Sequence, residues 1–317
     1  MNGTQPSSCP SSATAVKIGM TFACCLILIV ALTGNTVIGI IVYKTKTMRK
    51  PINFFIVNMA MSDLVFPLFL IPSLIQTLYT NSWLIGGLLG QVLCKLEVFL
   101  PITSSAVSIQ SLVLIAVDRF GAVVFPLRSP LISSRMCPFF ILATCIVAIA
   151  VNSPYFVAGN LVEYPEGLSC ERLWNEAFGK SLSLENYRMP YFVVFIFIPL
   201  VLIAILYITI YLKLKSQEIP GEQSANAGQQ RQQREQRERN VLKMAIAIVL
   251  GFAVCWLPVT IFDCIVHITD THVRSSCGVR YYVYVGRLMA IANSAINPCI
   301  CLIFSRSYRN GLKALFR

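Results

Sequence analysis

The sequence predicts an all-α membrane protein, a bundle of seven transmembrane helices followed by a short amphipathic helix at the C-terminus. Composition, long uncharged windows and the placement of basic residues lead to this fold class. Of the 317 residues, 56% are hydrophobic and only 13% are charged, and the mean hydropathy is +0.69. Soluble domains carry about 25% charged residues, which cover their surface. This chain has too few charged residues for a surface of that kind.

Seven windows have the composition of membrane spans, which need about 20 mainly apolar residues each. The window 54–93 contains one charged residue, Asp63, and is long enough for one helix and a loop. The other six contain no Asp, Glu, Lys or Arg and cover residues 18–43, 98–117, 136–162, 189–212, 244–262 and 288–305. Each window therefore predicts one helix.

Basic residues set the predicted orientation. If the N-terminus lies outside, 18 of the 26 Lys and Arg residues fall in cytoplasmic segments, in accord with the positive-inside rule. The net charge of +12 is then a topology signal, and we expect no nucleic-acid partner. We expect a multi-pass protein of the plasma membrane, in which Asn2 of the sequon Asn2-Gly3-Thr4 is a candidate glycosylation site on the outer side.

The chain divides into three predicted parts. Residues 1–16 form an extracellular tail rich in Ser, Thr and Pro, residues 17–304 form the seven-helix domain, and residues 305–317 form an amphipathic juxtamembrane helix. The residues of that helix expected to face lipid are Tyr308, Leu312, Leu315 and Phe316, and those expected to face phosphates are Arg309, Lys313 and Arg317. The stretch "RQQREQRERNVLKM" consists of good helix formers and predicts a cytoplasmic extension of helix six.

Twelve cysteines are present, and most lie inside predicted helices or on the cytoplasmic side. Four are expected on the oxidising side, where disulfides form: Cys9, Cys94, Cys170 and Cys277. These four allow three pairings, and Cys264 near the outer end of helix six competes as a partner. No C-x-x-C pattern or His cluster suggests a metal site.

Short motifs follow one another on the predicted helices. Helix one has Gly34-Asn35, helix two has "NMAMSDL", and helix three opens with Cys94 and closes with Asp118-Arg119-Phe120. Helix five has Pro199 and Tyr207, helix six has "FAVCWLP", and helix seven has "NSAINP". From about residue 34 to residue 312 this series resembles the rhodopsin-like (class A) G-protein-coupled receptors.

The chain departs from the family pattern at two places. Helix four lacks the usual Trp, and Thr144 or Cys145 stands about there. Cys301 replaces the Tyr of the NPxxY motif, which puts in doubt the Tyr–Tyr water bridge that Tyr207 would make in the active state.

The resemblance implies a cell-surface receptor, not an enzyme, that binds an extracellular ligand and activates heterotrimeric G proteins. Arrestin and membrane lipids are further expected partners, and no cofactor is expected unless an allosteric sodium ion binds at Asp63. Ile291 stands where opsins have their retinal-linking Lys, and Pro101 stands where amine receptors have an Asp. The stretches "VDRFGAVVFPL" and "CWLP" look most like those of neuropeptide receptors of the RFamide, neuropeptide Y, galanin and somatostatin type. The alternatives are a class A receptor for a lipid or another small non-amine ligand, or a polytopic transporter.

A ligand site is expected at the outer end of the bundle, and its candidate residues are Gln76, Glu97, Pro101, Trp256, Asp263 and Arg287. A charge at membrane depth is costly, so it is paired or lines a wet cavity. Arg287 has two interpretations: it pairs with Glu97 or Asp263 and holds helices together, or these charges meet a peptide's ends or its basic side chains.

The resemblance implies a Cys94–Cys170 disulfide, which leaves Cys9 and Cys277 as a second candidate pair. It also implies that Asp63 is the centre of a polar pocket, formed with Ser108, Asn293, Ser294 and Asn297. Two states of that pocket remain open, because a charged Asp63 would bind sodium and a protonated Asp63 would need no ion.

The resemblance finally implies a set of residues for coupling to a G protein. Trp256, Phe252 and Pro258 would form a switch in helix six, and Leu127 would insert into a groove of the G protein. Arg119 is expected to bridge Asp118 and Glu238 at rest, although Glu238 has Arg234 and Arg239 as rival partners. The coupling residues are Asp118, Arg119, Leu127, Tyr207, Glu238, Phe252, Pro258 and Pro298.

Overall fold

The computed structural model describes residues 14–80, 82–126, 130–165, 167–179, 182–216, 225–268 and 277–315. Within these ranges the side chains of residues 185, 225–235, 237, 238, 262–268, 277 and 280 are not described. Seven helices of the described chain are long and apolar enough to cross a membrane, which confirms the predicted fold class.

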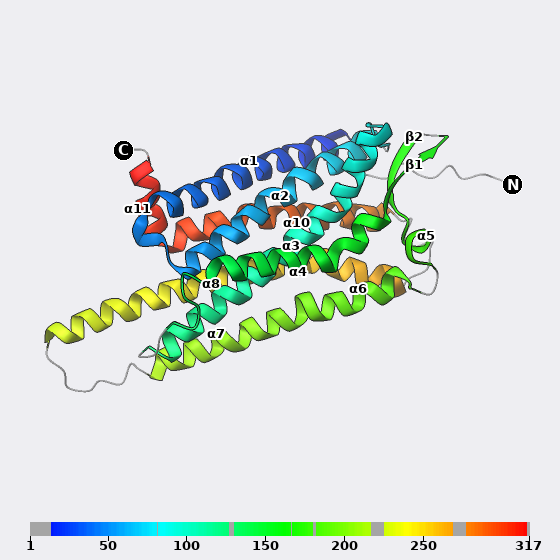
Figure 1. Cartoon of the computed structure of the whole chain (residues 1–317). Helices are drawn as coiled ribbons and strands as arrows, with labels where there is room; N and C mark the ends of the chain where they lie inside the picture. Colours follow the sequence, from blue (N-terminus) through cyan, green and yellow to red (C-terminus); the bar gives the residue numbers. More distant parts are fainter. Residues whose placement is uncertain are drawn as a thin grey trace.

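The helices run side by side in a bundle (Figure 1). The first four spans are α1 (Thr14–Lys44), α2 (Pro51–Tyr79), α3 (Gly87–Val124) and α4 (Cys137–Ala158). The fifth consists of α6 (Leu184–Phe192), the π-helical turn η3 (Val193–Phe197) and α7 (Ile198–Ser216). The last two spans and the C-terminal helix are α8 (Ala225–Ile268), α10 (Cys277–Phe304) and α11 (Arg306–Leu315).

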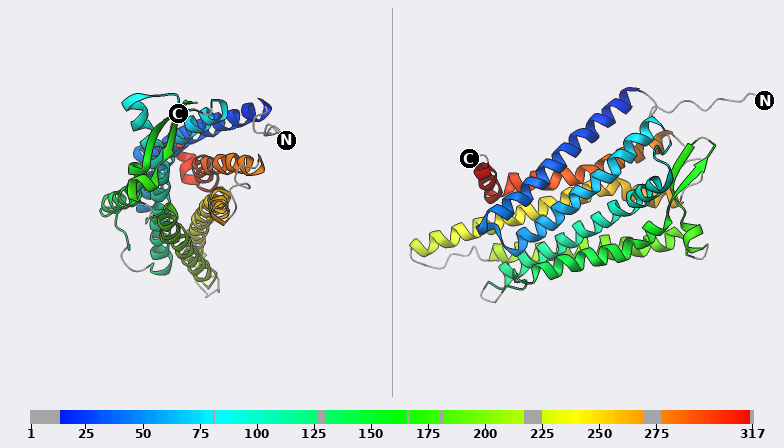
Figure 2. Two further views of the ribbon diagram at one scale, coloured as in Figure 1. Left: turned by 90° about the vertical axis from the view of Figure 1, so that its right-hand side faces the viewer. Right: turned by 45° about the horizontal axis from the view of Figure 1, so that its top comes forward.

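The predicted extension of helix six is present, since α8 begins at Ala225 and projects past its neighbours at the end of the bundle where α11 lies (Figure 2). At this same end a short 3-10 helix, η2 (Lys46–Met48), joins α1 to α2.

A β-hairpin lies at the opposite end of the bundle (Figure 1), between the fourth and fifth spans, where the sequence analysis predicted no strand. Strand β1 (Gly159–Tyr164) pairs antiparallel with β2 (Gly167–Arg172), and the short helix α5 (Trp174–Phe178) follows. The predicted disulfide is confirmed: Cys94 at the start of α3 is bonded to Cys170 of β2, with their Cα atoms 5.5 Å apart. This bond fixes the hairpin to the bundle.

Helix α3 lies at the centre, packed against α2, α4 and α7. The main core contains Phe55, Ile115, Ile203 and Ile248, all nearly inaccessible, while large apolar side chains such as Phe22 lie on the outside. Exposed apolar surface of this kind suits a lipid environment, where the driving force is packing and internal hydrogen bonding rather than burial from water.

Helices α1 and α10 approach one another closely because of three residues. Pro298 has no N–H, so the carbonyl of Ser294, four residues earlier, lacks its helical donor. The Asn35 Nδ2 of α1 donates to that carbonyl at 2.9 Å. The approach requires a glycine at position 34, because a Cβ there would lie 2.7 Å from Pro298 Cγ.

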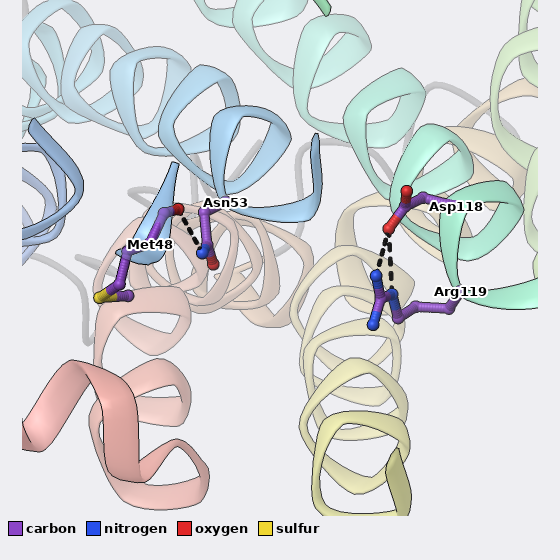
Figure 3. A network of polar contacts seen from close by, with 4 residues as sticks. All are labelled: Met48, Asn53, Asp118 and Arg119. Carbon is purple, nitrogen blue, oxygen red and sulfur yellow. Dashed lines mark hydrogen bonds and ion pairs between the residues drawn. The ribbon is translucent and has the colours of Figure 1, made fainter. Parts of the chain in front are cut away.

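The expectation that Tyr308 of α11 faces lipid is wrong. Tyr308 is 1% exposed, and its hydroxyl donates to Asn53 Oδ1 of α2 at 3.1 Å, so it contacts protein and does not face lipid. Asn53 Nδ2 in turn donates to the Met48 carbonyl at 2.6 Å (Figure 3). An amphipathic pattern indicates an apolar face but not what covers it; here Gly311 lies close to Ile41 and lets α11 pack on α1. Burial raises the pKa of Tyr308 well above its ordinary value, so the hydroxyl keeps its proton.

We expect Gly34→Ala to destabilise the bundle by about 1–3 kcal/mol, because the new methyl group overlaps the rigid Pro298 ring. Gly39→Ala is the matched control: it lies on the same helix and its Cβ would meet nothing within 4 Å. The control should be neutral or stabilising, since Ala is the better helix former. Melting temperatures of both variants in one detergent check this, and equal values would contradict the packing argument.

Candidate functional site

A buried polar centre joins three helices. Asp63 of α2 is 2% exposed and accepts a hydrogen bond from Ser108 Oγ of α3 at 3.1 Å. It also accepts one from Asn297 Nδ2 of α10 at 2.7 Å. Asn293 and Ser294 are buried as well, but no bond from either to Asp63 is present in the described chain.

The polar centre has acceptor atoms to spare. The Oδ1 atoms of Asn293 and Asn297 are buried and have no hydrogen-bond partner among the described residues. Orphaned buried oxygens of this kind are normally satisfied by a water or an ion. Carboxylate, amide and hydroxyl oxygens are also the donor set that a hard cation prefers.

A second polar cluster, which the sequence interpretation missed, lies closer to the inner end. Asn58 Nδ2 donates to Ser111 Oγ at 2.9 Å and to Thr144 Oγ1 at 3.2 Å, joining α2, α3 and α4. Thr144 is therefore the inward-facing residue of helix four, while Cys145 packs beside it against Ala148. The spacing of Asn58 and Ser62, four residues apart on one face with Asp63 adjacent, was the available signal.

An outer cavity of about 230 Å³ opens near the hairpin end and reaches Trp256. Three of the predicted ligand residues line it: Pro101, Trp256 and Arg287. Its further lining is Phe66, Leu70, Ile102, Tyr155, Arg172, Arg188, Met189, Tyr191, Phe192, Ile196, Val259, Thr260 and Ala290. Sequence reasoning missed Arg172 and Arg188, although Arg172 follows the disulfide cysteine by two residues.

Two predicted ligand residues lie outside this cavity. Gln76 Nε2 donates to the Ser82 carbonyl at 2.6 Å, so it fixes the loop after α2. Glu97 Oε2 lies 3.9 Å from Cys170 Sγ, beside the disulfide. The side chain of Asp263 is outside the described residues.

Trp256 connects the cavity to the core. Its ring stacks on Phe252 with a centroid distance of 5.7 Å and meets Phe66 edge-on at 5.6 Å. Pro258, two residues further along α8, leaves the carbonyl of residue 254 without a helical donor, which allows a bend there. The floor of the cavity, which includes Trp256, therefore lies within one helical turn of the position at which α8 can bend.

At the inner end, Arg119 and Asp118 form an ion pair within α3. Arg119 Nε and Nη2 both donate to Asp118 Oδ2, at 3.0 and 2.5 Å (Figure 3). Both side chains are mostly buried, and Tyr207 of α7 lies in the core cluster that also contains Ile115 and Ala116 of α3. Leu127 and the side chain of Glu238 lie outside the described residues, so the expected Arg119–Glu238 bridge remains a prediction.

Further predicted positions also fall outside the description: Asn2, Cys9 and the side chains of Cys264 and Cys277. Cys301 is buried in the core cluster that also contains Tyr308. Within the described chain, no group of three or more His, Cys, Asp or Glu residues has the arrangement of a metal site.

Comparison with known proteins identifies the family to which these features belong. Residues 34–300 match the model of the seven-transmembrane receptors of the rhodopsin family. The chain is 29% identical to a QRFP-like peptide receptor of Branchiostoma floridae, over 92% of this chain and 76% of that protein. It is 28% identical to the substance-K receptor of Mesocricetus auratus and to the substance-P receptor of Meriones unguiculatus, again over 92% of this chain and over 73% and 69% of theirs.

The family match begins within α1 at Gly34 and ends within α10 at residue 300, so it takes in at least part of every span. Its members are receptors and not enzymes. This chain therefore belongs to the rhodopsin family of seven-transmembrane receptors.

Proposed function

We propose that this receptor binds a neuropeptide in the outer cavity and activates a heterotrimeric G protein at its inner end. The observation that carries the proposal is the position of Trp256, which lines the cavity and stacks on Phe252 in the core. The names of the related proteins, which are receptors for QRFP-like peptide, substance K and substance P, support a peptide ligand.

The receptor's place in the cell is part of the proposal. We infer a plasma-membrane location, with an extracellular tail at residues 1–16, a receptor domain at residues 17–304 and a juxtamembrane helix at residues 305–317. The Cys94–Cys170 disulfide supports an oxidising compartment at the hairpin end, and 18 of 26 basic residues support a cytoplasmic opposite end.

Activation would run through α8. A ligand that contacts Trp256 would bend α8 at Pro258. Closer to the inner end, Tyr207, Pro298 and the Asp118–Arg119 pair would then rearrange. Glu238 would hold Arg119 at rest, and Leu127 would contact the G protein. Arrestin and membrane lipids would be further partners at the inner end.

The polar centre would hold a sodium ion. Asp63, Ser108, Asn293, Ser294 and Asn297 supply the oxygens, and two of the amide oxygens lack partners among the described residues. The ion would neutralise the buried carboxylate and hold α2, α3 and α10 in the resting arrangement, because a lone charge at this depth is costly.

We expect at least one peptide of a neuropeptide panel to raise nucleotide exchange on a heterotrimeric G protein by the purified receptor in lipid nanodiscs. Panels of lipids and of small non-amine ligands run in parallel. Arg119→Ala should reduce exchange while leaving peptide binding intact, since Arg119 lies at the inner end. A response confined to lipids would replace the peptide proposal with the alternative receptor class, and ligand-driven solute flux without exchange would reject signalling.

We expect sodium chloride, compared with choline chloride at equal ionic strength, to weaken binding of an activating peptide to the wild-type receptor. The peptide favours the active arrangement and the ion the resting one, so each lowers the affinity for the other. Asp63→Asn should remove this sensitivity, because it removes the anionic ligand. An unchanged sodium effect in Asp63→Asn would argue against an ion at this centre.

A further inference from the structure

Basic side chains gather at the inner end of the bundle, where α1, η2, α2 and α11 meet. Five of them are exposed, and their side chains make no hydrogen bond or ion pair with another described residue: Lys44, Lys46, Lys50, Arg306 and Lys313. We call these five residues the basic corner.

Two contacts bring the segments of the basic corner together. Helix α11 packs against α1 (Figure 1), where Gly311 lies so close to Ile41 that an added Cβ would overlap its side chain. Lys44 follows Ile41 by three residues, which is about one helical turn. Tyr308 of α11 donates to Asn53 Oδ1 in the first turn of α2 at 3.1 Å. Helix α11 is therefore held against the inner ends of α1 and α2, which η2 connects.

Two further cations of this region bond to carbonyls at helix ends. Arg49 donates to the carbonyl of Tyr43 in the last turn of α1, at 2.8 Å. Arg309 donates to the carbonyl of Leu302 in the last turn of α10, at 3.0 Å. Terminal carbonyls of a helix need donors and carry partial negative charge. These two arginines supply donors at both helix ends, and the five cations of the basic corner stay exposed.

The two segments that carry the basic corner contain no acidic residue. The first acid of the chain is Asp63, which is buried in the polar centre, and the last is Asp270. The basic extension of α8 differs, because its sequence interleaves arginines with Glu235 and Glu238. The basic corner is thus a concentration of one sign of charge beyond the count of basic residues that sets topology.

Apolar side chains beside the basic corner indicate the kind of partner. Tyr43 and Phe304 are exposed at the ends of α1 and α10, and aromatic side chains in such places lie at the membrane interface. Lys44 is the next residue after Tyr43, and Arg306 is two residues after Phe304. These cations therefore lie at the depth of lipid headgroups, where clustered Lys and Arg attract anionic lipids.

Building on the membrane orientation proposed above, we propose that the basic corner binds headgroups of anionic phospholipids in the cytoplasmic leaflet. The exposed ammonium and guanidinium groups of η2 and α11 act as one surface, because α11 is fixed beside η2 by its contacts with α1 and α2. The phosphate and carboxylate oxygens of the headgroup accept their hydrogen bonds.

Competition between two lipids tests the proposal. The complete receptor in detergent is equilibrated with equal amounts of phosphatidylserine and phosphatidylcholine that have the same acyl chains, and bound lipid is counted by native mass spectrometry. One cation near an anionic surface contributes about fivefold, which corresponds to about 1 kcal/mol. We expect phosphatidylserine to bind about 25-fold more than phosphatidylcholine, as two engaged cations would give.

Two double variants assign the preference to the basic corner. Lys46→Gln with Lys50→Gln removes two charges around η2, and Arg306→Gln with Lys313→Gln removes two from α11. Each should lower the preference for phosphatidylserine at least about fivefold, because both segments contribute to one surface. The side chains are exposed, so the substitutions should leave the bundle intact.

Lys213→Gln with Lys215→Gln is the matched control. Both lysines are exposed in the last turn of α7, so this variant removes the same charge from the inner end outside the basic corner. It should keep the wild-type preference. An equal loss in this control would show attraction by overall charge and overturn the inference, as would a loss in only one of the two corner variants.

Two other results would also overturn it. Equal binding of the two lipids by the wild-type receptor would remove the lipid site and leave the peptide receptor standing, since nucleotide exchange is measured separately. Corner variants that keep the lipid preference but lose binding of nucleotide-free G protein would assign the basic corner to the G protein instead.

Discussion

The hydrogen bonds that Asp63 accepts from Ser108 and Asn297 join α2, α3 and α10 at one buried point of the bundle. Hydrocarbon offers no hydrogen-bond partner, so each polar group of a span must find one inside the protein. Two further inward-facing amides follow the same rule: Asn58 bridges to α3 and α4, and Asn35 supplies the donor that Pro298 cannot. Polar contacts thereby fix how five of the helices lie, and apolar packing fills the space between them.

This arrangement separates two ends with different chemistry. At the hairpin end, a disulfide holds β2 beside a cavity whose lining includes Arg172, Arg188 and Arg287. At the other end, Arg119 is paired with Asp118, and α11 is held by the Tyr308–Asn53 hydrogen bond. The polar centre and the stacked rings of Trp256 and Phe252 lie between them, which makes them the contacts through which the two ends would influence one another.

The seven spans and the extension of α8 could be predicted from the sequence, because apolar length and helix propensity are local properties. The Cys94–Cys170 bond followed from the family resemblance. The hairpin was missed because its two short strands stabilise each other only once the disulfide and the bundle hold them. The side chain of Tyr308 was assigned to lipid because periodicity gives an apolar face without its neighbour. Arg172 and Arg188 were missed for a related reason: the sequence does not tell which side of β2 or of α6 faces the cavity.

The proposed function requires that the outer cavity and the inner end are coupled, and a measurement of reciprocal binding tests this coupling. Equilibrium binding of an activating peptide is measured on the receptor in nanodiscs, with and without a nucleotide-free G protein. Coupling predicts that the G protein raises peptide affinity by about 5- to 150-fold, and that Trp256→Ala removes most of this gain. Equal affinity with and without the bound G protein in the wild-type receptor would contradict the claim.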